Sequence, residues 1–503
     1  MTAEHESLDT FLFETLTEVE RSHVLLPSFS QWGFSLIAMS EIALSLSDLG
    51  SEVSIAMWGS RTPLPDVGWS TPRWIARALG TKSQDEQVQH ALVAAGIPID
   101  HFMAPTIRSW KPAEALVAPS VLARTQIRAL RYRGSPMGRA ILQLRPDHAV
   151  PVTDDYVWPK EWLIESMRSY AFVYDQISKL IATEGITAVV VSNGRFLHDR
   201  AAAEAATDSG AAVLYYDFGG VSTAFDLTRE TTHDWQALQR RMIAMYQNWP
   251  DLDRDQIGSE WFINRSSHQD PANAHFTDAQ RIGETIEVPQ GKKLVVFFSS
   301  SGDEFAELEL DWSEFFEGQP QALATLARIC REEPNVYLVV RSHPHKRRKA
   351  PQDVAEWHAA VQEANPDLHL DEFSDIDSYA LMRQADVVVT YGSTTGVEAA
   401  FMGRSVVVLG PSAYDNLGCA VRPADVDRLR EVIQTPQEGD QSGAIAFGLM
   451  MQRRGFNLTR LTRIDSKSFA IGGKTISQPH SLARKISDWR ARRLRTQISG
   501  GLW

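Results

Sequence analysis

The chain has 503 residues, 43% of them hydrophobic, which is enough for two or three domains with sizeable cores. Its 63 acidic and 50 basic residues give a formal net charge of −13. This balance argues against a nucleic-acid-binding protein, because such proteins usually carry a dominant basic field. The two cysteines, Cys330 and Cys419, are far apart and match no metal-ligand spacing. We therefore expect reduced thiols, no disulfide framework and a cytoplasmic protein.

The first half of the chain predicts strands that alternate with helices. The N-terminus is acidic, unlike a signal peptide, and no apolar run approaches the ~20 residues of a membrane span. Short apolar runs predict strands at 23–29, 52–59, 99–104, 186–194 and 211–220, and helical periodicity appears at 34–49, 83–95, 159–184 and 197–208. We expect a first Rossmann-like domain over 1–285, with a variable insert at about 60–150.

The second half repeats this alternation more regularly. Strands are predicted at 293–300, 336–343, 368–373, 386–392 and 405–410, and helices at 319–332, 352–364, 377–385 and 394–402. The polar stretch 248–290 has little periodicity and is expected to join two domains. The predicted fold class is α/β, with two doubly wound Rossmann-like domains facing a cleft. The second domain spans 286–475, and a basic helix at 476–503 would return to the first.

Unusual polar clusters follow the predicted strands: "SNGRFLHD", "YYDFGG", "SSSGDE", "RSHPHKRRK" and "YGSTTG". Ligands of doubly wound domains bind beyond the carboxyl ends of the strands, so these clusters are candidate sites. In "YGSTTG", Ser393, Thr394 and Thr395 lie where a helix begins, and their hydroxyls and N–H groups would seat an anion. The alternative is that Ser393 or Thr394 only caps the helix.

Two further clusters carry candidate phosphate ligands. Arg341 and His343 directly follow a buried strand and place positive charge in an otherwise acidic chain, whereas 347–349 is better interpreted as a solvated basic loop. In "FFSSSGDEF", Ser300 and Ser301 form a small-residue turn that a phosphate could approach, and the acidic pair Asp303 and Glu304 could contact the substrate. The stretch lacks the endings of nucleotide-triphosphatase and dinucleotide loops, which argues against ATPase and NAD-dependent enzymes.

These residues resemble a known family. The stretches "SSSGDEF", "RSHPH", "DIDSYALMRQADVVVTYGSTTGVEAAFMGRSVVVLGPSAY", "SNGRFLHDRAAAEAA" and "YYDFGG" are similar to glycosyltransferases of capsule and surface polysaccharide biosynthesis, which have the two-Rossmann GT-B fold. The resemblance is most specific over 294–415 and looser over 186–240. It implies that His343 and Ser393–Thr395 hold the phosphate of a nucleotide-activated sugar, and that Glu398 reaches the nucleotide ribose. Where the family often has a glutamate before paired glycines, this chain has Asp217.

Sugar transfer also needs a group that deprotonates the acceptor hydroxyl. Asp217, Asp199 and His233 are the candidates, each near the end or exit of a strand of the first domain. Asp217 is ranked first because it ends a strongly apolar strand, while Asp199 could merely complement a helix dipole. Asn193 and Arg195 would hold sugar hydroxyls or simply form the turn.

We expect no metal and no cofactor. The stretches "DLD" at 251–253 and "DID" at 375–377 mimic an Asp-x-Asp metal motif, but Asp377 precedes a helical pattern and is better interpreted as its N-cap. Two basic stretches, 121–145 and 482–495, mix apolar and Arg positions at helical spacing. They are solvated helix faces or, alternatively, contacts with anionic lipid at the inner face of the membrane.

The predicted function is metal-independent transfer of a sugar from a nucleotide-activated donor to a surface polysaccharide or lipid-linked glycan acceptor. CMP-, UDP- and GDP-linked donors are not distinguished, and neither are retention and inversion. The alternatives are a nucleotide-sugar epimerase of the same fold, a CDP-polyol phosphotransferase and a non-catalytic carbohydrate-binding or scaffold protein. Epimerases pair glutamates after the Ser-Gly turn, whereas Glu398 is followed by Ala399 and Ala400.

Overall fold

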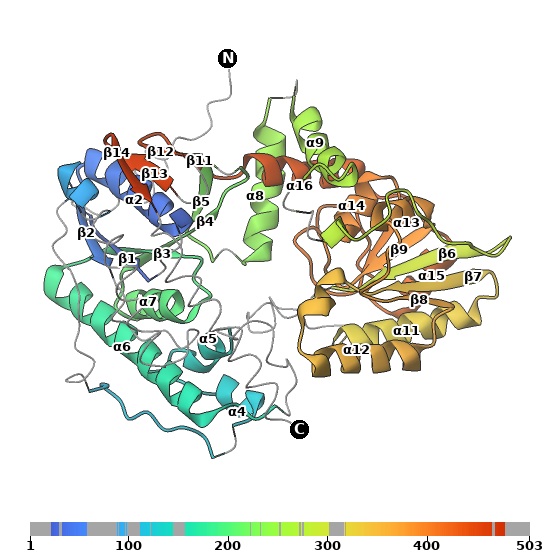
Figure 1. Cartoon of the computed structure of the whole chain (residues 1–503), viewed down its shortest axis with the longest axis horizontal. Coiled ribbons are helices and arrows are strands. Elements are labelled where there is room, and N and C mark those ends of the chain that lie inside the picture. Colours follow the sequence, from blue (N-terminus) through green and yellow to red (C-terminus); the bar gives the residue numbers. More distant parts are fainter. Residues whose placement is uncertain are drawn as a thin grey trace. The chain divides into compact units, whose positions relative to one another are not determined.

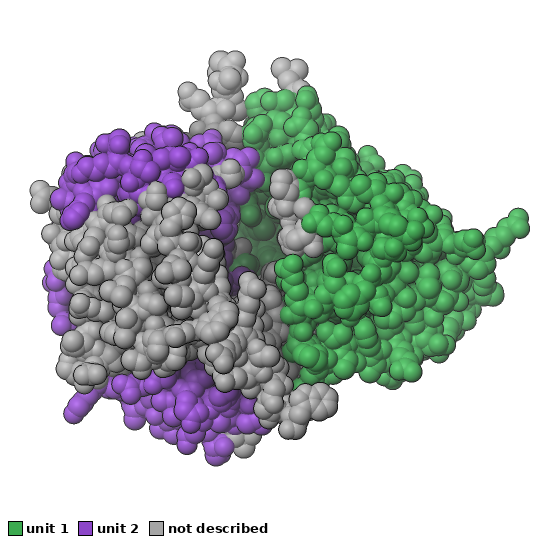
Figure 2. Space-filling view, viewed as in Figure 1, with its two compact units in different colours: residues 1–3, 148–152, 233–454 green, residues 4–147, 153–232, 455–503 purple. Residues whose placement is uncertain are grey.

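The computed structural model describes most of the chain and divides it into two compact units (Figures 1 and 2). Among the described residues, His233 to Arg454 form unit 1, and the residues before His233 form unit 2 together with those from Gly455 onward. The structure describes residues 22–29, 33–57, 88, 90–95, 97, 111–120, 122–143, 156–221, 223–231, 233–250, 253–270, 273, 276–300, 316, 318–464 and 468–477.

Unit 2 is built on a six-stranded sheet with the order β11-β5-β4-β3-β1-β2. Its strands are β1 (His23–Ser28), β2 (Glu52–Met57), β3 (Ala188–Ser192), β4 (Ala212–Phe218), β5 (Ala224–Thr228) and β11 (Phe456–Asn457). The first four are parallel, whereas β5 and β11 are antiparallel to their neighbours. Because β1 pairs with both β2 and β3, the strand order reverses at β1 and β3. In α/β sheets, ligands bind beyond the carboxyl ends of the strands at such a point.

Helices and a small sheet cover the two faces of this sheet. One face packs on α2 (Gly33–Asp48) and on the hairpin-connected strands β12 (Leu461–Arg463), β13 (Ser468–Ile471) and β14 (Lys474–Ser477). On the other side, α7 (Leu197–Asp208) contacts β3 and β4 and packs against the long helix α6 (Lys160–Glu184). Figure 1 shows α7 beside α6.

The basic stretch 121–145 is not one amphipathic helix. It forms two short helices, α4 (Arg124–Arg128) and α5 (Met137–Gln143), joined by a turn in which Tyr132 and Ser135 bridge. Arg124 is buried, and Tyr132 donates to Asp175 on α6 at 2.8 Å. The stretch is therefore part of the packing of unit 2. The second basic stretch, 482–495, lies outside the described residues.

A buried carboxylate fastens the C-terminal segment to unit 2. Glu41 on α2 is 0% exposed, and its oxygens accept the backbone N–H groups of Thr459, Arg460 and Leu461 at 2.7 to 3.1 Å. The Thr459 hydroxyl also donates to it at 2.7 Å. Several donors at once satisfy a charge that would otherwise be costly to bury.

Unit 1 is a parallel five-stranded sheet with the order β10-β9-β6-β7-β8. Its strands are β6 (Lys293–Phe298), β7 (Val336–Arg341), β8 (Leu368–Leu370), β9 (Val387–Thr390) and β10 (Ser405–Val408). The first strand in the sequence, β6, is central and pairs with β7 on one side and β9 on the other. The strand order therefore reverses between β6 and β9, as in a Rossmann fold.

Alternate residues of these strands enter two separate cores. Val295 and Phe297 pack with α11 (Gln319–Glu332), α12 (Pro351–Ala364) and α15 (Val426–Gln434). Leu294, Val296 and Phe298 pack on the opposite face with α13 (Ser378–Gln384), α14 (Thr395–Phe401) and α16 (Gln441–Arg453). Figure 1 shows α11 and α12 together on one side of this sheet. Strands buried on both faces explain the uninterrupted valine runs.

The predicted α/β class with two parallel-sheet units is confirmed. Each predicted strand within the described residues coincides with an observed strand, while 99–104 lies outside them. Cys330 and Cys419 are buried free thiols, and Asp377 caps α13 by accepting from the Tyr379 N–H at 2.9 Å, both as predicted. Among the described residues, no helix is long and apolar enough to cross a membrane.

The division between the units differs from the predicted boundaries. It falls at His233 and Gly455 rather than at 285 and 475. The stretch interpreted as an interdomain passage contains α9 (Arg254–Ser266), which with α8 (Trp235–Asn248) packs on α16 of unit 1. Gly258 and Gly448 let α9 and α16 approach closely, because a Cβ on Gly448 would lie 2.1 Å from the Gly258 carbonyl oxygen. Helix–helix packing of this kind is not visible in local periodicity.

Candidate functional site

The polar clusters of unit 1 meet at one edge of its sheet. In the register of the sheet, Phe298 at the end of β6 pairs with Arg341 of β7 and with Thr390 of β9. The residues that follow these strands, Ser299, Ser342 and Tyr391, therefore lie side by side at the carboxyl edge. This edge includes the point between β6 and β9 where the strand order reverses.

Hydrogen bonds join the β6 and β7 exits. The His343 N–H donates to the Ser299 hydroxyl at 2.8 Å, and the Ser299 N–H donates to the Arg341 carbonyl at 3.0 Å. Ser300 is held by Gln319, whose Oε1 accepts its N–H at 2.6 Å. These hydrogen bonds fix the position of the turn after β6 relative to the turn after β7.

The ring of His343 is oriented by its neighbours. Its Nδ1 accepts the His345 N–H at 3.1 Å, so the proton of the neutral ring lies on Nε2. The Phe276 ring meets the imidazole edge to face, with centroids 5.2 Å apart. Nε2 is thus the nitrogen through which His343 can donate to a phosphate oxygen.

The Ser-Thr turn after β9 is ordered by its own hydroxyls. Ser393 Oγ lies 2.9 Å from Thr395 Oγ1 and accepts the Thr395 N–H at 3.3 Å. Thr394 occupies the N-cap position of α14 but makes no side-chain capping hydrogen bond, and it is exposed. The Ser393 hydroxyl therefore caps the start of α14, whereas the Thr394 hydroxyl does not.

Tyr414 supports this turn from the loop after β10. Its hydroxyl donates to the Ser393 carbonyl at 2.5 Å and lies 3.2 Å from Thr390 Oγ1. Gly396 leaves room for this hydroxyl, since a Cβ there would come within 2.2 Å of it. Gly392 has a φ of +80°, and a Cβ there would lie 2.4 Å from the Pro411 carbonyl oxygen. Tyr414 was not predicted to have a role, although it ends the quoted stretch that contains this turn.

Arg341 is placed differently from the prediction. It is 2% exposed, and its guanidinium donates to the carbonyls of Asp371 and Ser374, at 3.2 and 3.0 Å, in the segment after β8. Burial lowers the pKa of Arg341 to about 10. In this structure Arg341 ties down a loop and adds positive charge beneath the edge, rather than presenting its guanidinium there.

Glu398 is also buried, at 4% exposure, in the first turn of α14. Its Oε1 accepts from Arg265 Nη2 at 3.1 Å and from Nε at 3.3 Å. Arg265 in turn donates to Asp270 and Asn273 and stacks on Trp261. The structure thus gives Glu398 a buried ionic partner from α9, a helix that was not predicted from the sequence.

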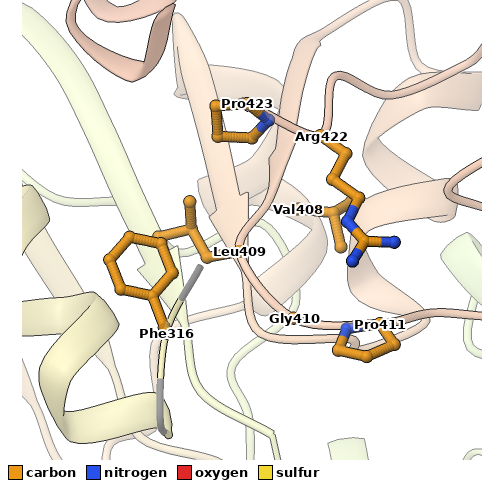
Figure 3. A pocket seen from close by; sticks show the side chains of 7 residues that line it. All are labelled: Phe316, Val408, Leu409, Gly410, Pro411, Arg422 and Pro423. Carbon is orange, nitrogen blue, oxygen red and sulfur yellow. The ribbon is translucent and has the colours of Figure 1, made fainter. Parts of the chain in front are cut away.

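A small pocket lies at the exit of β10 (Figure 3). It is lined by Phe316, Val408, Leu409, Gly410, Pro411, Arg422 and Pro423. Arg422 Nη1 lies 3.4 Å from Asp415 Oδ2, so the cation of this pocket is already engaged by a carboxylate.

In unit 2, Asp217 and Asn193 come together at the carboxyl ends of β4 and β3. Asn193 Nδ2 donates to Asp217 Oδ2 at 2.5 Å, and the Phe218 N–H donates to Asp217 Oδ1 at 2.8 Å. Asn193 therefore contacts the candidate base. Gly219 serves the β4–β5 turn, because a Cβ there would lie 2.7 Å from the Ala224 backbone.

Asp199 is the most perturbed carboxyl group of this cluster. It lies in the first turn of α7 and is 7% exposed. Burial, with a further contribution from the charge of Asp217, raises the pKa of Asp199 to about 8. Buried carboxyl groups with a strongly raised pKa are candidates for acid–base chemistry. The structure thus strengthens Asp199 relative to the order expected from the sequence.

The other predicted residues are more dispersed. His233 belongs to unit 1, in the turn before α8, and not to the unit that holds Asp199 and Asp217. The Arg195 guanidinium lies over the ring of its neighbour Phe196, 4.7 Å from the centroid. Ser301, Asp303 and Glu304 lie outside the described residues. Within the described part of the chain, no group of three or more His, Cys, Asp or Glu side chains could hold a metal ion.

One known protein family matches the segment that forms this sheet edge. Residues 278–437, which include the exits of all five strands of unit 1, match the capsule polysaccharide biosynthesis protein family. The resemblance predicted from the sequence is confirmed over this segment. No curated protein matches the chain significantly.

Several solved structures are similar to the chain. The beta Kdo 2,7 transferase KpsC of Thermosulfurimonas dismutans is 15% identical, with a TM-score of 0.36, over 63% of this chain and 89% of that chain. A glycosyltransferase of Rickettsia africae is 10% identical, with a TM-score of 0.28, over 87% and 95% of the two chains. The UDP-GlcNAc 2-epimerase of Neisseria meningitidis is 10% identical, with a TM-score of 0.26, over 94% and 99%. TM-scores this low add nothing to the sheet topology described above.

Proposed function

We propose that the chain is a nucleotide-sugar-dependent glycosyltransferase of capsule or surface polysaccharide synthesis. The observation that carries the proposal is the meeting of Ser299, His343 and the 393–395 turn at the reversal point of the unit 1 sheet, inside the family match. Doubly wound sheets bind nucleotides at this kind of place. The acceptor is a growing glycan or a lipid-linked glycan.

The hydrogen-bond donors at this sheet edge suit the chemistry of sugar transfer. When a nucleotide sugar reacts, negative charge develops on the leaving phosphate and must be stabilised by donors that are already in place. His343 Nε2, the Thr394 hydroxyl and the N–H groups of the 393–395 turn supply such donors, while buried Arg341 adds a positive potential. A carboxylate of unit 2, Asp199 or Asp217, takes the proton of the acceptor hydroxyl.

A panel of UDP-, GDP- and CMP-linked sugars tests the reaction class. A transferase slowly hydrolyses its donor without acceptor and releases the nucleotide, whereas an epimerase converts the sugar without cleavage. A CDP-polyol phosphotransferase would act on CDP-linked glycerol or ribitol instead. A non-catalytic scaffold protein would act on no compound of either kind. Nucleotide release from one donor would support the proposal, while conversion without release would replace it by the epimerase.

Nucleotide binding should depend on His343. His343→Ala removes one charge-assisted contact and should weaken binding of the cognate nucleotide by about 1.5 to 3 kcal/mol, roughly 10- to 150-fold. Calorimetry with CMP, UDP and GDP measures this. Arg347→Ala is a matched control, since Arg347 is an exposed basic residue of the short 3-10 helix Pro344–Arg348 that follows His343, and it should change the affinity by less than about threefold. Equal affinities of wild type and His343→Ala would place the phosphate elsewhere.

Turnover should not require a divalent metal. This prediction rests on the Asp-x-Asp stretch at 375–377, where the carboxylate of Asp377 is committed to the N–H groups of Tyr379 and Gly283, at 2.9 and 2.8 Å. Nucleotide release should therefore be the same with and without EDTA. Loss of activity in EDTA that magnesium or manganese restores would show that metal-binding carboxylates had been overlooked.

A further inference from the structure

Asn193 has an unusual backbone conformation. It lies between β3 and α7 with a φ of +55°, in the left-handed region that residues other than glycine seldom adopt. Its N–H donates to the Tyr216 carbonyl at 2.8 Å, which extends the β3–β4 ladder by one residue. The turn thus starts at a position set by the sheet.

The side chain of Asn193 crosses from β3 to β4. Its Nδ2 reaches Asp217 Oδ2 at 2.5 Å, while the Phe218 N–H holds Oδ1 at 2.8 Å. Each carboxylate oxygen has its own donor, one from the turn after β3 and the other from β4. Together they define the plane of the Asp217 carboxylate.

Other titratable groups surround this pair. Asp199 and His198 lie at the start of α7, where His198 Nε2 is 3.0 Å from the Ser169 hydroxyl of α6. Tyr216 of β4 is buried, and burial raises its pKa. The charge of Asp217 is one of the causes that raise the pKa of Asp199. The direction in which Asp217 points therefore affects the protonation of its neighbour.

We propose that Asn193 is a positioning residue, which uses its left-handed backbone to aim an amide N–H at Asp217 and so orient that carboxylate for proton transfer. The inference rests on the proposed function. It differs from the expectation that Asn193 binds sugar hydroxyls, because the side-chain N–H is directed at a protein carboxylate.

Asn193→Gly is a clean test, because glycine adopts positive φ without strain and only the side chain is lost. Asn365→Gly is the matched control: Asn365 has a φ of +48° at the end of α12 in unit 1. Both variants should melt close to wild type. Asn193→Gly should lower kcat for nucleotide release by about 10- to 100-fold, the effect of a misplaced catalytic group. Its affinity for free nucleotide should be unchanged, and Asn365→Gly should retain full turnover.

The division of the effect between kcat and KM provides a readout that a merely structural residue would not change. The lost contact orients a carboxylate and binds no substrate atom, so Asn193→Gly should lower kcat and leave KM for the donor unchanged. Wild-type kcat in Asn193→Gly, with Asp217→Asn inactive, would overturn the proposal and leave the glycosyltransferase function standing.

A different result would show that the proposed function itself has failed. If wild type releases nucleotide from no donor of the panel, carboxyl ¹³C shifts of labelled aspartate still report the contact. The resonance that disappears in Asp217→Asn should then change its chemical shift in Asn193→Gly and keep it in Asn365→Gly. An unchanged shift would reject the orienting role independently of any activity.

Discussion

Replacing Asp199 by Asn is expected to lower turnover by about 10²- to 10⁴-fold while making the protein more stable at pH 8, because a buried carboxyl group with a raised pKa favours function at the expense of folding. If Asp199 is the base, kcat should rise with pH towards a midpoint near 8, the folded-state pKa of this group. Asp217→Asn should also lower turnover, but its amide can accept from only one of Asn193 and Phe218, so this variant should reduce stability.

The sign of the stability change follows from proton binding. The pKa of Asp199 is about 8 in the folded protein and 3.8 ordinarily, so between these values only the folded state holds the proton. The stabilisation from Asp199 is fully present below about pH 4 and is lost as the pH rises through 8. Asn cannot ionise, so Asp199→Asn should flatten this part of the pH–stability curve and gain a few kcal/mol at pH 8 at most.

Chemical unfolding between pH 4 and 9, with nucleotide-release kinetics on the same samples, checks both halves of this prediction. Asp208→Asn, at the exposed opposite end of α7, is the control and should leave turnover unchanged. A less stable Asp199→Asn that still turns over normally would show that Asp199 only complements the helix dipole, and the candidate base would then be Asp217 alone.

Glu41→Ala should destabilise the protein by about 3 to 5 kcal/mol, the cost typical of removing one partner from a buried charged cluster. The backbone N–H groups of Thr459, Arg460 and Leu461 would lose their acceptor while the surrounding helix and sheet keep water out. Glu41→Gln retains one acceptor oxygen and should cost less. Denaturant unfolding of unit 2 measures the difference.

Glu52→Ala serves as the control, since Glu52 is exposed at the start of β2 and should change stability by less than about 0.5 kcal/mol. Equal stabilities for Glu41→Ala and Glu52→Ala would mean that the return of the chain to unit 2 depends on the apolar contacts of Phe469 and Ile471 rather than on the carboxylate.

Local sequence signals were sufficient wherever the determining interaction is local. Runs such as Val387–Val389 predicted fully buried strands because both faces of a parallel strand meet apolar side chains. Asp377 was recognisable as an N-cap because its carboxylate bonds a backbone N–H two residues away. The clusters at His343 and at 393–395 could be placed at one sheet edge because parallel strands end together.

Long-range partners could not be predicted in this way. Arg265 binds Glu398 across 133 residues, and Glu41 binds Thr459 across 418 residues. Neither pair produces a periodic pattern in the local sequence. The segment from Gly455 to Ser477 joins unit 2 because its strands pair and pack there, although in sequence it follows unit 1.

The sequence by itself determined the α/β class, the order of the elements and which strand ends carry clusters of polar side chains, since hydrophobic periodicity and turn residues act over a few positions. The tertiary structure decided which of those side chains face the sheet edge and which are buried and bonded to other residues inside the unit. Arg341 and Glu398 were assigned to a ligand but are buried against a loop and an arginine, whereas Asp199 acquired its raised pKa only from burial beside Asp217. Burial and charge proximity depend on residues far apart in the chain, and so the protonation of the candidate base is a property of the folded unit alone.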